Sequence, residues 1–128
     1  MSPNTANGAL RVLVVDDDAM YLELVERSLR SFNIDVVTTD SAIGVTNIIR
    51  RTEPHVVLLD VNIPALSGDA LLGIVRKHAP VTTKFILFSS SDEATLRKRA
   101  TDCRADGWIS KSAEASTLAT YLERAARR

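Results

Sequence analysis

The chain has 128 residues, 45% of them hydrophobic and 25% charged, a composition typical of one globular domain with a single core. Sixteen basic residues balance sixteen acidic ones, so the charge does not favour a nucleic-acid partner. The single cysteine, Cys103, excludes an internal disulfide and suits a cytoplasmic location, and no apolar run reaches the roughly 20 residues of a membrane helix. We expect residues 1–9 to be a disordered leader and residues 10–128 to form the domain.

Five short segments predict β-strands because they are rich in β-branched and large apolar residues. These segments are Arg11–Val15, Ile34–Thr38, His55–Leu59, Phe85–Phe88 and Gly107–Ile109. In the third, Val56 to Leu59 form an unbroken apolar run, which is typical of a strand buried on both faces of a parallel sheet. We therefore place this segment at the centre of the sheet.

The segments that follow these strands have apolar residues at helical spacing. The first helix is predicted from about Asp18 to Phe32, with Leu22 off the apolar stripe as a single exposed leucine. The stripe is Tyr21, Leu24, Val25, Ser28, Leu29 and Phe32. Three later helices are predicted to begin at serine caps, which are Ser41, Ser90 with Glu93 as a capping box, and Ser112. The remaining helix follows Gly68 and ends near His78.

Strands and helices thus alternate along the whole chain. Right-handed crossovers between parallel strands place helices on both faces of one sheet. The common small solution for five strands is the order 2-1-3-4-5. We therefore predict an α/β fold, a doubly wound five-stranded parallel sheet of the flavodoxin-like (βα)5 type.

Acidic residues follow two of the predicted strands. The triplet Asp16–Asp18 comes directly after the first strand, and Asp60 comes directly after the central one. Because ligands bind at the carboxyl ends of strands in open α/β sheets, we expect these carboxylates to meet there and bind Mg²⁺. Asp18 can serve simply as the cap of the next helix. His55 and His78 lack partners at ligand spacing and are interpreted as loop residues.

The same carboxyl edge of the predicted sheet also carries a hydroxyl group and a basic side chain. Ser89 follows the fourth strand and Lys111 follows the fifth. A carboxylate such as Asp60 can attack phosphorus and form an aspartyl phosphate, while Mg²⁺, a lysine and a hydroxyl neutralise or bind the phosphoryl oxygens. Each feature is common on its own, but their joint position at four strand ends indicates a site for phosphoryl transfer.

With these motifs the sequence resembles the receiver domains of two-component response regulators, of the chemotaxis-receiver type. The resemblance covers about residues 11–124. It rests on four stretches, which are Val15-Asp16-Asp17, Asp60-Val61-Asn62-Ile63-Pro64-Ala65-Leu66-Ser67-Gly68, Phe88-Ser89-Ser90 and Trp108-Ile109-Ser110-Lys111.

The resemblance implies a role in phosphorelay signalling rather than conventional enzyme catalysis. Asp60 would accept a phosphoryl group from a sensor histidine kinase or a phosphotransfer protein. Asp16, Asp17, Asp60 and the main-chain carbonyl of Asn62 would bind Mg²⁺. No other cofactor is implied, and the phosphorylated domain would act by contacting a downstream protein effector.

The resemblance also assigns switch residues, and here the sequence departs from the family pattern. Ser89 stands at the position of the switch hydroxyl, Trp108 at that of the switch aromatic, and Lys111 at that of the active-site lysine. Trp108 is bulkier than the usual Tyr or Phe. Ser112 replaces a proline that usually follows the lysine in a cis bond; since a cis bond before serine costs about 2.5–4 kcal/mol, we expect a trans bond here.

Two further hypotheses remain beside the phosphorylated receiver. One is a pseudo-receiver, an interaction module that works without phosphate. The other is an Mg²⁺-dependent phosphatase with an aspartate nucleophile, for which the chain has no cap or substrate-pocket insertion. For the receiver we expect a monomer or weak homodimer and an output face on the fourth helix, fifth strand and fifth helix. The basic residues expected to be exposed there are Arg97, Lys98, Arg99 and Arg104.

Overall fold

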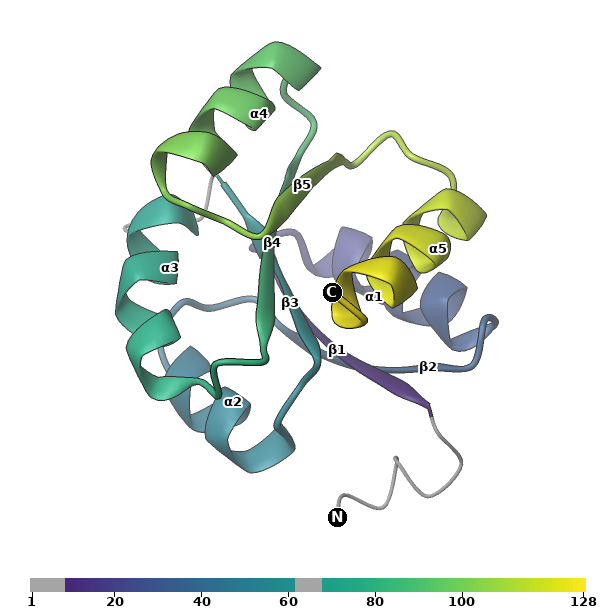
Figure 1. The fold of residues 1–128 in the computed structure, drawn as a ribbon. Coiled ribbons are helices and arrows are strands. Elements are labelled where there is room, and N and C mark those ends of the chain that lie inside the picture. The colour runs from purple at the N-terminus through teal and green to yellow at the C-terminus, as the bar shows by residue number, and fades with distance from the viewer. Residues whose placement is uncertain (1–8, 62–67) are drawn as a thin grey trace.

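The computed structural model describes residues 9–61 and 68–128. The strands are β1 (Leu10–Val15), β2 (Ile34–Thr39), β3 (Val56–Asp60), β4 (Lys84–Ser89) and β5 (Gly107–Ser110). The helices are α1 (Ala19–Arg30), α2 (Val45–Thr52), α3 (Gly68–Val75), the 3-10 helix η2 (Arg76–His78), α4 (Glu93–Asp102) and α5 (Ala115–Ala126). The strands form one parallel sheet in the order β2-β1-β3-β4-β5, which confirms the predicted fold (Figure 1).

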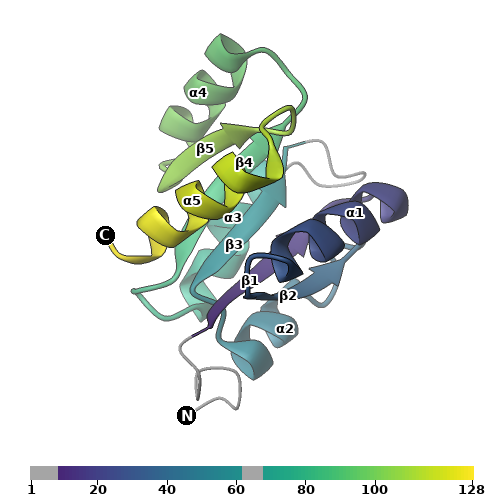
Figure 2. The ribbon, with the colours of Figure 1, turned by 90° about the vertical axis from the view of Figure 1, so that its right-hand side faces the viewer.

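The sheet separates two layers of helices. Helices α1 and α5 cover one face, and α2, α3 and α4 cover the other (Figures 1 and 2). All five residues of β3 are buried, as its apolar run predicts. Side chains alternate along it, because successive strand residues point to opposite faces: Leu58 packs under α1 and α5, while Val57 and Leu59 pack under the other helices.

The buried stripe of α1 differs from the predicted one. Leu22, Val25 and Leu29 are buried, whereas Leu24 is 58% exposed and Phe32, beyond the end of the helix, is 43% exposed. The helix is rotated so that Leu22 replaces Leu24 in the core, because the stripe centres on Val25 and Leu29. Leu22 is therefore a core residue, and its predicted exposure is wrong.

The three predicted serine caps are also wrong. Helix α2 begins after Gly44, whose φ of 88° is a left-handed conformation that glycine adopts without strain. Asp92 caps α4 by accepting a hydrogen bond from Thr95 N at 2.9 Å, and this bond lowers the pKa of the Asp92 carboxyl. Helix α5 begins after Glu114 without a side-chain cap.

Asp18 caps α1, as predicted, by accepting from Met20 N and Tyr21 N. Two of the three serines bond within their own loops instead: Ser41 Oγ accepts from Ile43 N, and Ser112 N donates to Ser110 Oγ.

Candidate functional site

The carboxyl ends of the strands bring the predicted site residues to one edge of the sheet. Asp16 follows β1, Asp60 ends β3, Ser89 ends β4, and Lys111 follows β5. The strand register aligns these ends, because Val15 lies opposite Leu59, Asp60 opposite Phe88, and Ser89 opposite Ser110. Four elements distant in sequence thus contribute side chains to a single site.

Three carboxylates form the centre of this site. Asp16, Asp17 and Asp60 each offer an oxygen, and these oxygens lie within 4.8 Å of one another. Asp16 is completely buried and Asp60 is 3% exposed, whereas Asp17 is exposed. Asp16 Oδ1 accepts a hydrogen bond from Asp18 N at 3.0 Å, while Oδ2 faces the ammonium group of Lys111. Buried carboxylates at this spacing repel one another, and a cation in contact with them removes that repulsion.

Lys111 supplies one such cation. Its Nζ lies 2.6 Å from Asp16 Oδ2 and 3.5 Å from Asp60 Oδ1, and its side chain is 17% exposed. Lys111 N donates to Ser89 O at 2.9 Å, which ties the lysine to the end of β4. The bond to Ser112 is trans, as expected, and the lysine nevertheless reaches both carboxylates. Ser112 N donates to Ser110 Oγ at 3.1 Å, so serine side chains shape this loop.

Tyr21 is a further site residue, which the sequence pattern predicted only as part of the apolar stripe of α1. Its ring centroid lies 4.8 Å from Lys111 Nζ and 6.0 Å from the centroid of Phe88. Burial, and then the charges of Asp16 and Asp60, raise the pKa of the Tyr21 hydroxyl to about 12. Its position three residues after the cap Asp18 was a usable signal, because the first turn of α1 must begin beside the acidic cluster.

The two predicted switch residues differ in burial. Ser89 is completely buried; its Oγ donates to Ser91 Oγ at 3.0 Å and accepts from Ser91 N at 3.0 Å. Trp108 is half-buried against the core layer under α2, α3 and α4. Trp108 N donates to the Tyr121 hydroxyl at 2.9 Å, which joins β5 to α5.

The carboxylate cluster fits a hard divalent cation such as Mg²⁺, which prefers oxygen ligands and binds through one or two carboxylates plus waters and phosphate oxygens. Asp16, Asp17 and Asp60 are the residues that would hold it. Asn62, the remaining predicted ligand, lies outside the described residues. The site can therefore bind a cation beside a buried carboxylate and a lysine.

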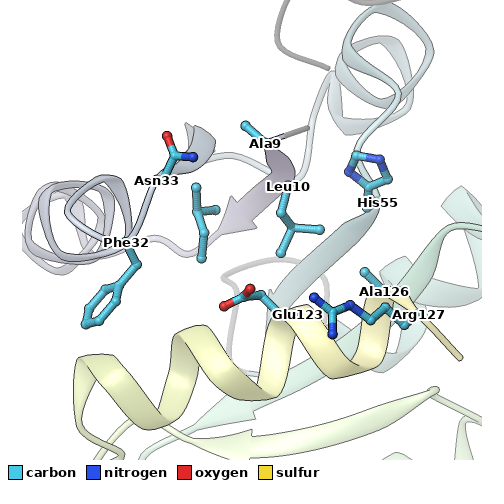
Figure 3. Close-up of a pocket in the computed structure, with 9 residues that line it drawn as sticks. Ala9, Leu10, Phe32, Asn33, His55, Glu123, Ala126 and Arg127 are labelled. Carbon is cyan, nitrogen blue, oxygen red and sulfur yellow. The ribbon is translucent and has the colours of Figure 1, made fainter. Parts of the chain in front are cut away.

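Two hollows lie away from this cluster. One of about 960 Å³ runs between α4, β5 and α5, and its lining includes Ser91, Trp108 and Tyr121. The other, of about 450 Å³, lies at the opposite end of the sheet (Figure 3). There Glu123 of α5 and Arg127, which follows that helix, lie near the start of β1 and the segment after α1. Neither hollow contains the acidic cluster.

Comparisons with known proteins agree with this geometry. Residues 12–123 match the response regulator receiver domain family. The transcriptional regulatory protein KdpE of Mycobacterium tuberculosis is 28% identical over 117 residues, which cover 91% of this chain and 51% of KdpE. The cell cycle transcriptional regulator CtrA of Caulobacter vibrioides is 28% identical over 102 residues, covering 80% of this chain and 44% of CtrA. The chain thus spans about half the length of these relatives.

Solved structures show the same likeness. The signal receiver domain of the response regulator NarL from Mycobacterium tuberculosis has a TM-score of 0.81 and 28% identity, with 93% of this chain and 97% of that one covered. The BeF3-activated N-terminal receiver domain of RstA from Klebsiella pneumoniae has a TM-score of 0.82 and 24% identity, with 92% and 99% covered. Across the part of the chain that the structure describes, none of the helices has both the length and the apolar character needed to cross a bilayer.

Proposed function

Since the chain belongs to the response regulator receiver domain family, a family of signalling modules rather than conventional enzymes, we propose that it accepts a phosphoryl group on Asp60. The donor would be a sensor histidine kinase or a phosphotransfer protein, and the signal would pass on through protein contacts. The observation that supports this most strongly is the position of Lys111, whose Nζ contacts both Asp16 and Asp60.

The proposed reaction is a displacement at phosphorus. An oxygen of the Asp60 carboxylate attacks, a P–O bond forms, and the bond from phosphorus to the donor breaks, with its electron pair leaving on the donor. Lys111 would pair with a phosphoryl oxygen and thereby balance charge that Asp60 and the incoming group bring together. Bound Mg²⁺ would supply further charge neutralisation, held by Asp16 and Asp17. Ser89 would donate to another oxygen after leaving its bond to Ser91.

Mass measurement of the intact protein tests this proposal. Incubation with Mg²⁺ and acetyl phosphate should add one phosphoryl group, and Asp60→Asn should add none. Asp35→Asn, which changes a carboxylate on β2 that pairs with Arg30, is the matched control and should label normally. Labelling of Asp60→Asn would contradict the assignment. Absence of label on the wild type would favour an interaction module that acts without phosphate.

The face of α4, β5 and α5 is the surface that we propose for the downstream partner. The hollow of about 960 Å³ lies on it, and Arg97 and Lys98 are exposed on α4. Two of the expected basic residues are less available to bind an acidic partner, since Arg99 is half-buried and Lys98 pairs with Asp102 at 3.1 Å. Charge reversal of Arg97 should weaken binding of a partner with an acidic patch and leave Asp60 labelling unchanged. Unchanged partner binding would place the interface elsewhere.

A further inference from the structure

The Lys111 side chain is held on two sides by groups of different chemistry. On one side Asp16 and Asp60 attract the ammonium. On the other side lie two aromatic faces, with Nζ 4.8 Å from the Tyr21 centroid and 5.1 Å from the Phe88 centroid. A lysine is a point charge on a flexible four-carbon chain, so two carboxylates alone allow its side chain several conformations. The two rings reduce the number of these conformations.

Tyr21 is itself rigidly placed. Its main-chain N donates to Asp18 Oδ1 at 3.1 Å, so the cap of α1 fixes the backbone that carries the ring. The ring packs with Phe88 at 6.0 Å between centroids, and Phe88 is fully buried opposite Asp60 in the strand register. The aromatic pair is thus anchored to both α1 and the central strands.

The neutral ring of Tyr21 suits contact with a cation. A tyrosine hydroxyl has a usual pKa of about 10, so the phenol is neutral at neutral pH. A neutral ring attracts a cation through the negative potential of its face, and the attraction grows when the pair is shielded from water. Lys111 is shielded in this way, since its side chain is 17% exposed.

We propose that Tyr21 is a positioning residue for Lys111: its ring, backed by Phe88, holds the ammonium against Asp16 and Asp60 and so prepares it for the phosphoryl oxygen. The role in phosphoryl transfer depends on the function proposed above for Asp60. The placement of the lysine does not depend on it, and the two can be tested separately.

Nuclear magnetic resonance tests the placement without any phosphate. Aromatic faces shift nearby protons upfield, so the ε-methylene protons of Lys111 should resonate upfield of an exposed lysine such as Lys77. Tyr21→Phe should keep this shift and Tyr21→Leu should reduce it. Tyr21→Met, a good helix former without a ring, replaces Tyr21→Leu if that variant does not fold. An unchanged shift in the ring-less variant would overturn the proposal.

A double-mutant cycle tests the consequence for phosphoryl transfer. Tyr21→Leu should slow labelling by acetyl phosphate about threefold to tenfold, the range expected from a partly shielded cation–π contact, and Tyr21→Phe should restore the rate. In a Lys111→Ala background the same Tyr21→Leu change should have no further effect, because the cation is gone. An equal loss in both backgrounds would show that Tyr21 acts by packing alone and would overturn the proposal. If wild type is not labelled at all, the function of Asp60 fails and the proton shifts still decide the placement of Lys111.

Discussion

The two ends of the sheet use their polar groups differently. At the amino end, Arg11 N donates to His55 Nδ1 at 2.9 Å, and the Arg11 guanidinium donates to Thr52 O at 3.2 Å and to Glu53 O at 2.7 Å. Thr83 Oγ1 donates to Pro54 O at 3.3 Å. At the carboxyl end, by contrast, the charges of Asp16, Asp60 and Lys111 face one another.

This difference shows where the chain keeps groups available for chemistry. At the amino end, main-chain carbonyls satisfy most of the side-chain donors, and Arg11 Nη1 is the exception among the described residues. Those bonds join β1 to the end of α2 and to β3, so they stabilise the fold. At the carboxyl end, the buried Asp16 carboxylate is paired with the Lys111 ammonium and not with a main-chain group, so these charges can pair with the charges of a bound ligand. We therefore expect mutations at the two ends to separate stability from phosphoryl transfer.

The largest effect at the carboxyl end, after loss of Asp60 itself, is expected from Lys111→Ala. Removing a charge that stabilises a transferring group typically costs about 10²–10³ in rate. Initial rates of labelling by acetyl phosphate, followed by mass, measure this effect. Lys84→Ala, at the opposite end of β4, is the matched control and should keep the wild-type rate. A wild-type rate in Lys111→Ala would remove the lysine from the mechanism.

Arg11→Met, at the amino end, should lower stability and leave phosphoryl transfer unchanged. It removes the bonds to Thr52 and Glu53 while keeping an aliphatic side chain, so the free energy of unfolding should fall by about 1–3 kcal/mol. Labelling of Asp60 should be unchanged. Urea denaturation measures the first effect, and Arg51→Met, an exposed arginine on α2, should change neither property. A labelling defect in folded Arg11→Met would show that the two ends are coupled.

Mg²⁺ should stabilise the protein through the carboxyl end. A ligand that binds only the native state adds RT ln(1 + [L]/Kd), which is about 1.4 kcal/mol at ten times Kd. Tm measured against Mg²⁺ concentration should therefore rise, and Asp17→Ala should remove most of the rise. Asp102→Ala changes an exposed carboxylate on α4 and should keep it. A Tm that does not respond to Mg²⁺ in the wild type would argue against a metal site.

A smaller effect is expected from pH at the amino end. Burial, and then the charge of Arg11, lower the pKa of His55 below its usual 6.5. The unfolded chain therefore binds more protons than the native state just below that value, and stability falls as the pH drops from 6.5 toward the lower native pKa. His55→Asn, which keeps a side-chain acceptor for Arg11 N, should flatten this dependence in urea denaturation between pH 6.5 and about 5. An equal slope in the variant would assign the dependence to other groups.

The sequence was sufficient for the sheet order and for the residues at its carboxyl edge, because apolar runs and strand-end residues are local signals. It failed where a choice depends on packing between distant elements. Leu22 and Leu24 are both apolar, and the sheet and α5 decide which of them is buried. Ser90 and Asp92 are both capping residues, and the loop after β4 decides between them. The helical pattern shows Tyr21 only as a stripe residue, because its contact with Lys111 joins residues 90 positions apart.

The smallest expected effect is optical and concerns Trp108, the single tryptophan of the chain. Trp108 lies opposite Leu87 in the register, beside the strand end that carries Ser89, and its N is bonded to Tyr121 of α5. If a phosphoryl oxygen draws the Ser89 hydroxyl away from Ser91, the loop after β4 and the neighbouring indole must adjust. Mg²⁺ with beryllofluoride, which mimics the phosphoryl group, should therefore change the fluorescence of Trp108.

Asp60→Asn should show no such change, and Tyr121→Phe tests whether α5 takes part. Loss of the Tyr121 hydroxyl frees Trp108 N, so the fluorescence change should differ in size from that of the wild type if the indole moves with α5. Calorimetry of beryllofluoride binding provides the independent measure of occupancy. Binding without a fluorescence change would make Trp108 a packing residue that takes no part in the switch.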